Sequence, residues 1–300
     1  MPTTRLVFGC GYLGLRTARL WQAAGDATIA ATRRAAPSPE MAAAGLHAFQ
    51  ADVADPATLR TLADVRTPAG AAPESLLYAV GYDRTGGPDI HAVYADGLQN
   101  VLAALPRSVS RVIYISTTGV YGPHSGEWVD ESTPPDPQRD GGRASLAAEQ
   151  RLAAHPLAAR SAILRLAGIY GPDRVPHLDK LRTGQPLPVA HDGWLNLIHV
   201  DDAARIVVAA DAWLAERAEA DGPHLFCVSD GAPVRRGDFY AEVARLLGTP
   251  PPQFVAPPAD SPAAARAGAS RRVRNDKLRQ TLPVALEHPN YRAGLAAILG

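Results

Sequence analysis

The stretch Leu6-Val7-Phe8-Gly9-Cys10-Gly11-Tyr12-Leu13-Gly14 decides the fold of this chain. Its apolar start predicts a strand, and the apolar residues that follow recur with helical spacing as far as Ala24. Between strand and helix the glycines follow the pattern G-x-G-x-x-G. In this position the pattern indicates a dinucleotide-binding turn, whereas glycines alone would also suit a plain strand–helix connection.

Each glycine of the turn has a separate expected task. Gly9 permits the tight turn, Gly11 lets the backbone approach a pyrophosphate, and Gly14 lets the helix pack close to the strand. The N–H groups and the positive dipole end of the helix then face the phosphates. Tyr12 and Leu13 are expected at the cofactor together with the glycines.

The composition sets broad limits on the function. The 300 residues are 46% hydrophobic, which is enough for a large core, and a formal net charge of zero gives no sign of a nucleic-acid partner. No apolar run suits a membrane span, and the first strand begins too early for a signal peptide. Cys10 and Cys227 are interpreted as buried thiols rather than redox-active ones. We expect a cytoplasmic protein with no membrane partner.

The second predicted strand, Ala27–Ala31, ends at Thr32-Arg33-Arg34. In dinucleotide-binding folds an acidic residue about 20 positions after the glycines usually binds the ribose 2′-hydroxyl. No acid stands here, and the guanidinium groups of Arg33 and Arg34 match the charge and geometry of a 2′-phosphate. The alternative is a solvated loop. The sequence therefore favours NADP over NAD as the cofactor.

Strands and helices alternate along the following chain. Strands are expected at 47–51, 76–80, 112–115, 162–166 and 225–228, and helices at 91–105, from about 142, after 199 and at 239–247. This alternation predicts an α/β protein with a doubly wound parallel sheet, the Rossmann fold. Ligands bind at the carboxyl ends of such strands, which places Gly81, Ser116 and Thr117 on the same rim as the glycine turn.

The pattern loosens after about residue 170. We expect residues 1–170 to form the dinucleotide-binding domain, with 200–230 returning to it. Residues 171–199 and 231–300 would form a smaller C-terminal lobe on the substrate side. Within that lobe, residues 249–262 carry six prolines and are expected to form a loop.

Further motifs follow the glycine turn in order: Ser116-Thr117-Thr118-Gly119-Val120-Tyr121-Gly122, then Arg165-Leu166-Ala167-Gly168-Ile169-Tyr170-Gly171-Pro172, then His199-Val200-Asp201-Asp202. Together they resemble the extended short-chain dehydrogenase/reductases, the NAD-dependent epimerase/dehydratase family. The resemblance covers about residues 5 to 248. The tail at 271–278 and 289–295 resembles an atypical branch of uncharacterised bacterial members.

The resemblance implies roles at matching positions. Thr117 matches a Ser/Thr whose hydroxyl, able to donate and to accept, bonds the reacting oxygen; a strand-end hydroxyl without that role is the alternative. Other residues would hold the cofactor: Asp52 and Val53 at the adenine, Ala79, Val80 and Gly81 at the ribose, Ser116 at its strand end, and Ala167 and Gly168 at the nicotinamide.

The catalytic dyad of the resembled family, Tyr-x-x-x-Lys, is absent. Alignment places Gly141 at the tyrosine and Ser145 at the lysine. No tyrosine occurs between Tyr121 and Tyr170, and no lysine precedes position 180. A substitute acid/base would have to come from elsewhere on the rim.

Tyr121 and His124 are the candidate substitutes. Imidazole titrates near neutral pH, whereas a phenol with its pKa of about 10 needs assistance. Arg143 would supply the missing positive charge, unless it is a solvated surface arginine. Thr117, Tyr121 and His124 are therefore the predicted catalytic residues.

Two other clusters have simpler interpretations. His199-Val200-Asp201-Asp202 contains metal-ligand types, but an aspartate that caps the following helix explains it, and no metal is expected. The run Arg271-Arg272-Val273-Arg274 fits either contact with an anionic substrate, such as a sugar nucleotide, or a solvated loop.

Two functions remain open. The first is an NAD(P)-dependent oxidoreductase or epimerase-like enzyme that acts on a small polar substrate, for example a sugar derivative, with hydride passing between the cofactor and a carbonyl held by Thr117. The second is a non-catalytic NAD(P)-binding sensor or scaffold that has lost the dyad. Members of the resembled family often pair through helices beside the sheet, which makes a homodimer a further expectation.

Overall fold

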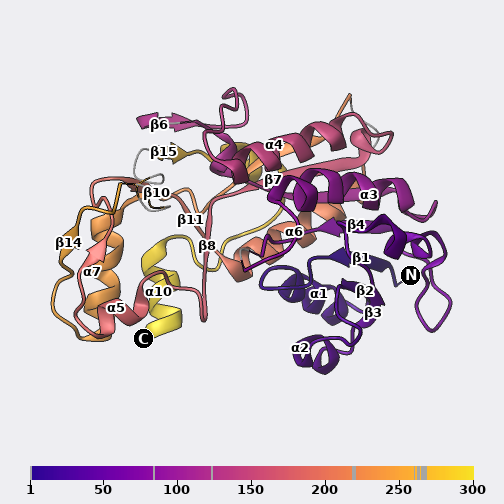
Figure 1. Cartoon of the computed structure of the whole chain (residues 1–300), viewed down its shortest axis with the longest axis horizontal. Coiled ribbons are helices and arrows are strands. Elements are labelled where there is room, and N and C mark those ends of the chain that lie inside the picture. Colours follow the sequence, from indigo (N-terminus) through magenta and orange to yellow (C-terminus); the bar gives the residue numbers. More distant parts are fainter. Residues whose placement is uncertain are drawn as a thin grey trace. The chain divides into compact units, whose positions relative to one another are not determined.

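A seven-stranded sheet, whose strands lie between residues 4 and 228, is the centre of the doubly wound fold in this computed structural model (Figure 1). From edge to edge its strands are β12 (His224–Val228), β7 (Ser161–Leu166), β5 (Arg111–Thr117), β4 (Ser75–Tyr78), β1 (Thr4–Phe8), β2 (Ala27–Thr32) and β3 (His47–Gln50). β1 pairs in parallel with both β2 and β4, and the pairs β2–β3 and β4–β5 are also parallel. The chain thus builds outward from β1 on both sides, which confirms the predicted doubly wound fold.

The structure describes residues 2–83, 85–122, 124–217, 221–259, 261, 264 and 269–300. It divides the chain into two compact units. The first comprises Met1–Thr117, Asp140–Arg165 and Ala204–Phe226, and the second comprises Thr118–Arg139, Leu166–Ala203 and Cys227–Gly300. The segment 118–139, which the sequence analysis assigns to the dinucleotide-binding domain, here groups with the second unit.

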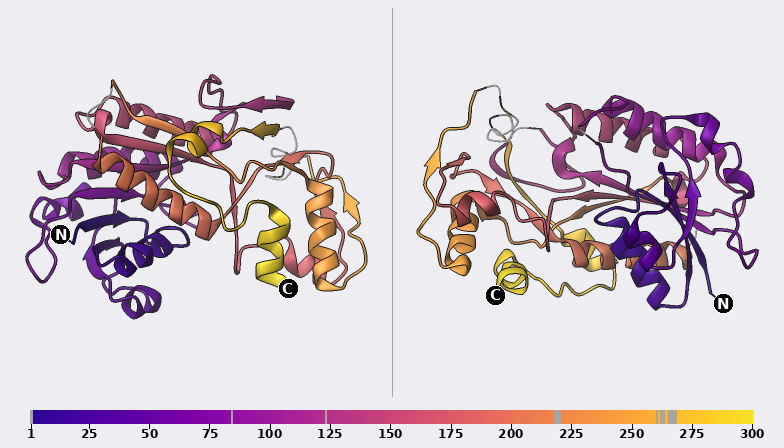
Figure 2. Two further views of the ribbon diagram at one scale, coloured as in Figure 1. Left: turned by 180° about the vertical axis from the view of Figure 1, so that it is seen from behind. Right: turned by 60° about the horizontal axis from the view of Figure 1, so that its bottom comes forward.

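Helices cover both faces of the sheet (Figures 1 and 2). On one face lie α3 (Gly97–Ala104) and α4 (Asp140–Ala153), and on the other lie α1 (Gly14–Ala23) and α6 (Val200–Ala215). Alternate residues of a strand point to opposite faces, so Leu6 and Phe8 of β1 share one core with Leu98 of α3 and Leu152 of α4. A smaller cluster joins Ala18 of α1 to Met41 of α2 (Pro39–Ala43).

The helix predicted at 91–105 begins irregularly. Residues Ala92–Asp96 form a π-helical turn that continues into α3. The hydroxyl of Tyr78 donates a 2.8 Å hydrogen bond to the carbonyl of Val93 within this turn. A side chain that hydrogen-bonds a helix carbonyl in place of its usual backbone partner is a recognised cause of local distortion.

Short 3₁₀ helices occur at Pro56–Leu59, Leu62–Asp64, Thr118–Val120 and Ala158–Arg160.

The second unit has its own core, in which Tyr170, Leu197, Phe239 and Leu295 are buried together. Its helices are α5 (Leu178–Arg182), α7 (Arg236–Leu247), α9 (Asp276–Thr281) and α10 (Tyr291–Leu299). Its strands pair as β6 (His124–Val129) with β15 (Ala269–Val273), β8 (Gly168–Tyr170) with β11 (Leu197–His199), β9 (Leu187–Pro188) with β14 (Phe254–Val255), and β10 (Trp194–Leu195) with β13 (Val234–Arg235). The proline-rich stretch therefore includes the two-residue strand β14, which the loop prediction missed.

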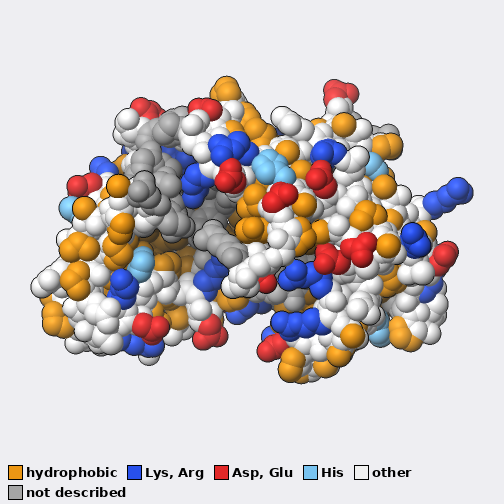
Figure 3. All heavy atoms as spheres, viewed as in Figure 1, with side chains coloured by type: hydrophobic (Ala, Val, Ile, Leu, Met, Phe, Trp, Pro, Cys, Tyr) orange, Lys and Arg blue, Asp and Glu red, His pale blue; other side chains and the backbone are white. Residues whose placement is uncertain are grey.

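Two features of the surface bear on possible partners. Among the described residues, no helix is long and apolar enough to cross a membrane. On the face shown in Figure 3, acidic and basic side chains are both spread over the surface, in keeping with the formal net charge of zero.

Candidate functional site

The glycine turn links β1 to α1, and two of its glycines are required by the protein's own packing. Gly9 has a φ of +89°, and a Cβ there would lie 2.3 Å from the backbone of Ala79. A Cβ on Gly14 would lie 2.3 Å from the carbonyl oxygen of Gly9. A Cβ on Gly11, in contrast, would meet nothing within 4 Å. Gly11 therefore borders open space, as a backbone that receives a ligand should.

Gly11 lines a groove of about 760 Å³ beside the loop that follows β2. Leu13, at the N-cap of α1, makes no side-chain capping bond, and the first turn of the helix carries no acidic residue. The helix therefore offers N–H groups and a positive dipole end to an anion in this groove. These features fit the pyrophosphate of a dinucleotide.

Arg16 also lines this groove, and the sequence analysis missed it. Its guanidinium donates a 2.8 Å hydrogen bond to the carbonyl of Tyr12 and lies 4.3 Å from the centre of the Tyr12 ring. These contacts hold a positive charge beside the glycine turn. The available signal was the position of a basic residue in the first turn after Gly14.

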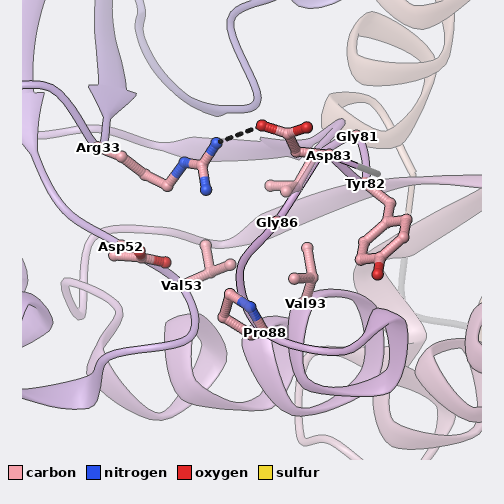
Figure 4. A pocket seen from close by; sticks show the side chains of 10 residues that line it. Arg33, Asp52, Val53, Gly81, Tyr82, Asp83, Gly86, Pro88 and Val93 are labelled. Atoms are coloured by element: carbon pink, nitrogen blue, oxygen red, sulfur yellow. Dashed lines mark ion pairs between the residues drawn. The ribbon is translucent and has the colours of Figure 1, made fainter.

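The loops after β2, β3 and β4 bring the expected ribose and adenine residues together. Thr32 ends β2, and its hydroxyl accepts a 3.2 Å hydrogen bond from the N–H of Arg34. Arg33 lines both the groove and a second, smaller pocket (Figure 4). Other expected residues that line this second pocket are Asp52, Val53, Val80 and Gly81. Ala79 lies against Gly9 instead, and its N–H donates to the carbonyl of Phe8.

Ser116, at the end of β5, belongs to a buried polar network. Its hydroxyl donates a 2.5 Å hydrogen bond to Oε1 of Glu149 on α4. Arg165 on β7 holds both carboxylate oxygens of Glu149, with Nε–Oε1 at 2.9 Å and NH2–Oε2 at 2.6 Å. The network ties β5, α4 and β7 together. The hydroxyl of Ser116 therefore donates its hydrogen bond to a partner within the protein and not to a cofactor. The sequence signal for this network was Arg165 itself, because an arginine within the apolar strand 162–166 needs an acidic partner inside the protein.

The positions aligned with the missing dyad lie on α4. Ser145 is buried, and its side chain is hydrogen-bonded to that of Tyr114. Burial raises the pKa of Tyr114 above its usual range, with the nearby Glu149 adding to the effect. Tyr114 is thus a neutral, internal phenol. A Cβ on Gly141 would lie 3.6 Å from Ile90. Neither position places an ionisable side chain at the rim.

The predicted catalytic residues are divided between the units. Thr117 is the half-buried last residue of β5 in the first unit, whereas Tyr121 and His124 belong to the second. The hydroxyl of Tyr121 is buried, donates a 2.7 Å hydrogen bond to the carbonyl of Asp130, and lies 3.0 Å from Sγ of Cys227. This geometry favours a structural role for Tyr121. His124 begins β6, and its side chain lies outside the described residues.

Ala167 and Gly168, expected at the nicotinamide, also belong to the second unit. The N–H of Ala167 donates to the carbonyl of Val228, and the N–H of Gly168 donates to that of Asn196. A Cβ on Gly168 would lie 3.2 Å from the carbonyl oxygen of Asn196. The close approach of this neighbouring backbone explains the glycine.

Both thiols were expected to be buried, but Cys10 is only partly buried and lines the groove, whereas Cys227 is buried as expected. Burial raises the pKa of Cys10 to about 11, although Arg19 opposes the shift. The thiol of Cys10 is therefore neutral near pH 7. Cys227 is fully buried beside Tyr121.

The cluster around His199 lies within the second unit. Nitrogen or oxygen atoms of His199, Asp202 and His288 lie within 4.8 Å of one another, and the two imidazole rings stack with centroids 3.8 Å apart. The carboxylate of Asp202 accepts hydrogen bonds from the N–H groups of Glu287 (2.8 Å) and His288 (2.9 Å). Both carboxylate oxygens of Asp202 thus hold the segment before α10. They do not cap the N-terminus of α6, which is how the sequence analysis explained the motif, and the expected absence of a metal stays a prediction.

Asp230 was not singled out from the sequence. It follows β12 and is buried, and Oδ1 accepts a 2.9 Å hydrogen bond from the N–H of Ala232. Burial raises the pKa of Asp230 to about 7, and the negative charge of Asp202 acts in the same direction. A carboxyl group that titrates near neutral pH is unusual, but nothing in the sequence marks it.

The basic run at 271–274 is not the solvated loop that was one of its two interpretations. It belongs largely to β15, which pairs in parallel with β6. Arg271 is buried and donates to the carbonyls of Tyr121 (2.9 Å) and Gly122 (2.8 Å), and burial lowers its pKa to about 10. Arg272 donates to the carbonyl of Gly126 and lies over the ring of Trp128. These arginines support the backbone of the second unit.

The fold and the glycine turn define a dinucleotide-binding α/β protein, and comparison with known proteins gives its family. The model of the NAD dependent epimerase/dehydratase family matches residues 6–222. Protein YeeZ of Escherichia coli (strain K12) is 32% identical over 258 residues, which cover 83% of this chain and 85% of YeeZ. The chain therefore belongs to the NAD dependent epimerase/dehydratase family, a group of NAD(P)-binding oxidoreductases and epimerases.

Solved structures agree with this assignment. A protein from Methylobacillus flagellatus is 32% identical, with a TM-score of 0.78 over 100% of this chain and 98% of that chain. The Bordetella bronchiseptica enzyme WbmG, solved in complex with NAD and UDP, shares the fold at 20% identity, with a TM-score of 0.78 over 99% of this chain and 94% of WbmG.

Proposed function

We propose that the protein binds NADP(H) in preference to NAD(H) and acts as an oxidoreductase or epimerase-like enzyme on a small polar, sugar-derived substrate. The observation that supports the cofactor preference is the run Thr32-Arg33-Arg34 at the end of β2. Both arginines line the groove beside the glycine turn, and no acidic residue stands at this strand end. A guanidinium pairs well with a phosphate, whereas an acid there would repel it.

The residues that would hold the cofactor follow from the site. Gly11 and the N-terminus of α1 would receive the pyrophosphate, Arg33 and Arg34 the 2′-phosphate, and Asp52 and Val53 the adenine. When bound, NADP(H) supplies or accepts a hydride. Thr117 would donate a hydrogen bond to the substrate oxygen whose charge changes in the reaction. The complex of WbmG with NAD and UDP supports a substrate of the sugar-nucleotide type.

A second candidate function is a non-catalytic NADP(H)-binding sensor or scaffold. The observations that favour it are the absence of the dyad on α4 and the internal hydrogen bond of Tyr121. Two assays separate the two functions: oxidation of NADPH by a panel of carbonyl compounds, and epimerisation of sugar nucleotides followed by NMR, because an epimerase consumes no NADPH overall. Turnover that is lost in Thr117→Val supports the enzyme. Tight cofactor binding with no turnover on any compound supports the sensor.

The cofactor preference is tested with Arg33→Ala. We expect NADPH binding to weaken about tenfold more than NADH binding, because only NADPH loses a charged partner. Arg60→Ala removes an exposed arginine outside both pockets and serves as the matched control. Equal losses for the two cofactors in Arg33→Ala, measured by calorimetric titration, would contradict the preference.

Pairing of two copies into a homodimer, which the family resemblance implies, is a separate proposal. Sedimentation equilibrium of the purified protein tests it, and a monomer at micromolar concentrations would contradict it.

A further inference from the structure

An ion pair crosses the smaller pocket between the loops after β2 and β4. NH2 of Arg33 lies 3.8 Å from Oδ2 of Asp83, and the two side chains point toward one another in Figure 4. Asp52 and Val53 line the same pocket, as do Pro88 and Val93. The enclosed space is about 40 Å³, which holds a few water molecules at most. The pocket itself is too small for an adenosine group, whereas the neighbouring groove of about 760 Å³, which Arg33 and Asp52 also line, is much larger.

The carboxylate of Asp83 is held in place from its other side. Oδ1 accepts hydrogen bonds from the N–H (2.9 Å) and the hydroxyl (2.6 Å) of Thr85. These bonds lower the pKa of Asp83, and the charge of Arg33 acts in the same direction. Asp83 is thus ionised at neutral pH, and its second oxygen is presented to Arg33.

The ion pair is weak enough for Arg33 to leave Asp83 for another anion. The side chains of Arg33 and Asp83 are 58% and 46% exposed, and a single contact of 3.8 Å is longer than a hydrogen bond. A phosphate can accept two parallel hydrogen bonds from one guanidinium at shorter distance. A 2′-phosphate would therefore displace Asp83 from Arg33, but it would still lie close to the negative charge of Asp83. A 2′-hydroxyl has no such conflict.

We propose that Asp83 is a specificity-determining residue that competes with the 2′-phosphate of NADP(H) for Arg33 and so limits the preference of the site for NADP(H) over NAD(H). This inference rests on the proposed binding of the 2′-phosphate by Arg33. It assigns cofactor choice to the loop after β4 in addition to the end of β2. With Asp83 in place, NADP(H) would keep only part of the advantage over NAD(H) that Arg33 gives it.

The test is Asp83→Asn, which removes the charge and keeps one oxygen to accept from Thr85. We expect NADPH to bind about three- to fivefold more tightly and NADH to change less than about twofold. Calorimetric titration gives both affinities, and 2′,5′-ADP against 5′-ADP isolates the 2′-phosphate from the nicotinamide. Thr85→Ala, which releases the carboxylate, should shift the preference in the same direction by a smaller factor.

Asp89→Asn is the matched control, because Asp89 is an exposed aspartate on the same loop whose Oδ1 accepts from the N–H groups of His91 and Ala92. An equal gain in Asp89→Asn and Asp83→Asn would mean that only the general charge of the loop matters, which overturns the inference. The gain should also vanish in the Arg33→Ala background. If Arg33→Ala leaves the cofactor preference unchanged, the proposed 2′-phosphate site itself fails. If Arg33→Ala changes it and Asp83→Asn does not, only the role of Asp83 fails.

Discussion

Two strand ends of the first unit, the turn after β1 and the end of β5, differ in how their polar groups are used. At the end of β1, a Cβ on Gly11 would point into open space and no side chain caps α1. Near the end of β5, Ser116 donates to Glu149, and two residues earlier on the same strand the side chain of Tyr114 is hydrogen-bonded to that of Ser145 of α4. The first strand end is open to a ligand, whereas near the second the side chains of Tyr114 and Ser116 are bonded to α4 and Thr117 alone is proposed to contact a substrate. In the proposed function, the open strand end would hold the cofactor, while Ser145 and Glu149 of α4 form hydrogen bonds within the protein.

We expect the largest effect on stability from the polar network near the end of β5. Glu149→Leu leaves Arg165 buried without its carboxylate, so the free energy of unfolding should fall by about 3–5 kcal/mol. Urea denaturation measures it. Asp96→Asn, which breaks an exposed pair with Arg151, should cost less than about 1 kcal/mol. Equal losses in the two variants would show that the network is not the structural element we describe.

Gly11→Val tests the glycine turn after β1. A valine at this position would fill the space that the pyrophosphate needs, so binding of either cofactor should weaken about a hundredfold or more. Because a Cβ there meets nothing within 4 Å, the variant should fold normally by circular dichroism. Gly9→Val is the contrasting control, since its Cβ would strike Ala79 and should reduce stability. A folded Gly11→Val variant with unchanged affinity would disprove the assignment of the turn.

Asp230, which follows β12, is a third strand-end residue whose polar group is buried. Because the pKa of Asp230 is about 7 in the folded protein and about 4 in an unfolded chain, the folded state holds this proton more tightly. Stability should therefore fall as the pH rises from about 4 to 7 and stay reduced above that range.

Asp230→Asn mimics the protonated form and should remove this slope. The free energy of unfolding of Asp230→Asn minus that of the parent protein should be about 1–3 kcal/mol larger at pH 8 than at pH 4. Urea denaturation at the two pH values measures it. Asp179→Asn, at an aspartate whose side chain is 96% exposed, should show no such gain. Parallel stability curves for the parent and Asp230→Asn would argue against a raised pKa.

The sequence predicted the parts of the molecule that depend on local pattern. The alternation of apolar strands and helices gave the doubly wound sheet, and the spacing of Gly9, Gly11 and Gly14 located the turn. Arg33 was found because it stands where dinucleotide-binding folds usually have an acidic residue, about 20 positions after the glycines. Asp52 was expected only from the resemblance to the family. The fold and the turn thus need only periodicity and spacing, whereas the position of the adenine needed the resemblance.

The remaining features depend on partners that are distant in the sequence. Ser116 and Glu149 are 33 residues apart, and Arg271 reaches Tyr121 across 150 residues. The contact between Arg33 and Asp83 joins two loops that no local pattern connects. For this reason hydroxyls and arginines that looked available for catalysis or substrate binding, such as Tyr121 and Arg271, proved to be used within the fold.

The most direct test of the central claim is a calorimetric titration of the purified protein with NADPH and with NADH. We expect both cofactors to bind and NADPH to bind more tightly, because the open turn at Gly11 would receive the pyrophosphate and Arg33 the 2′-phosphate. If neither cofactor binds, the glycine turn serves only the packing of β1 against α1, and the proposed function is wrong.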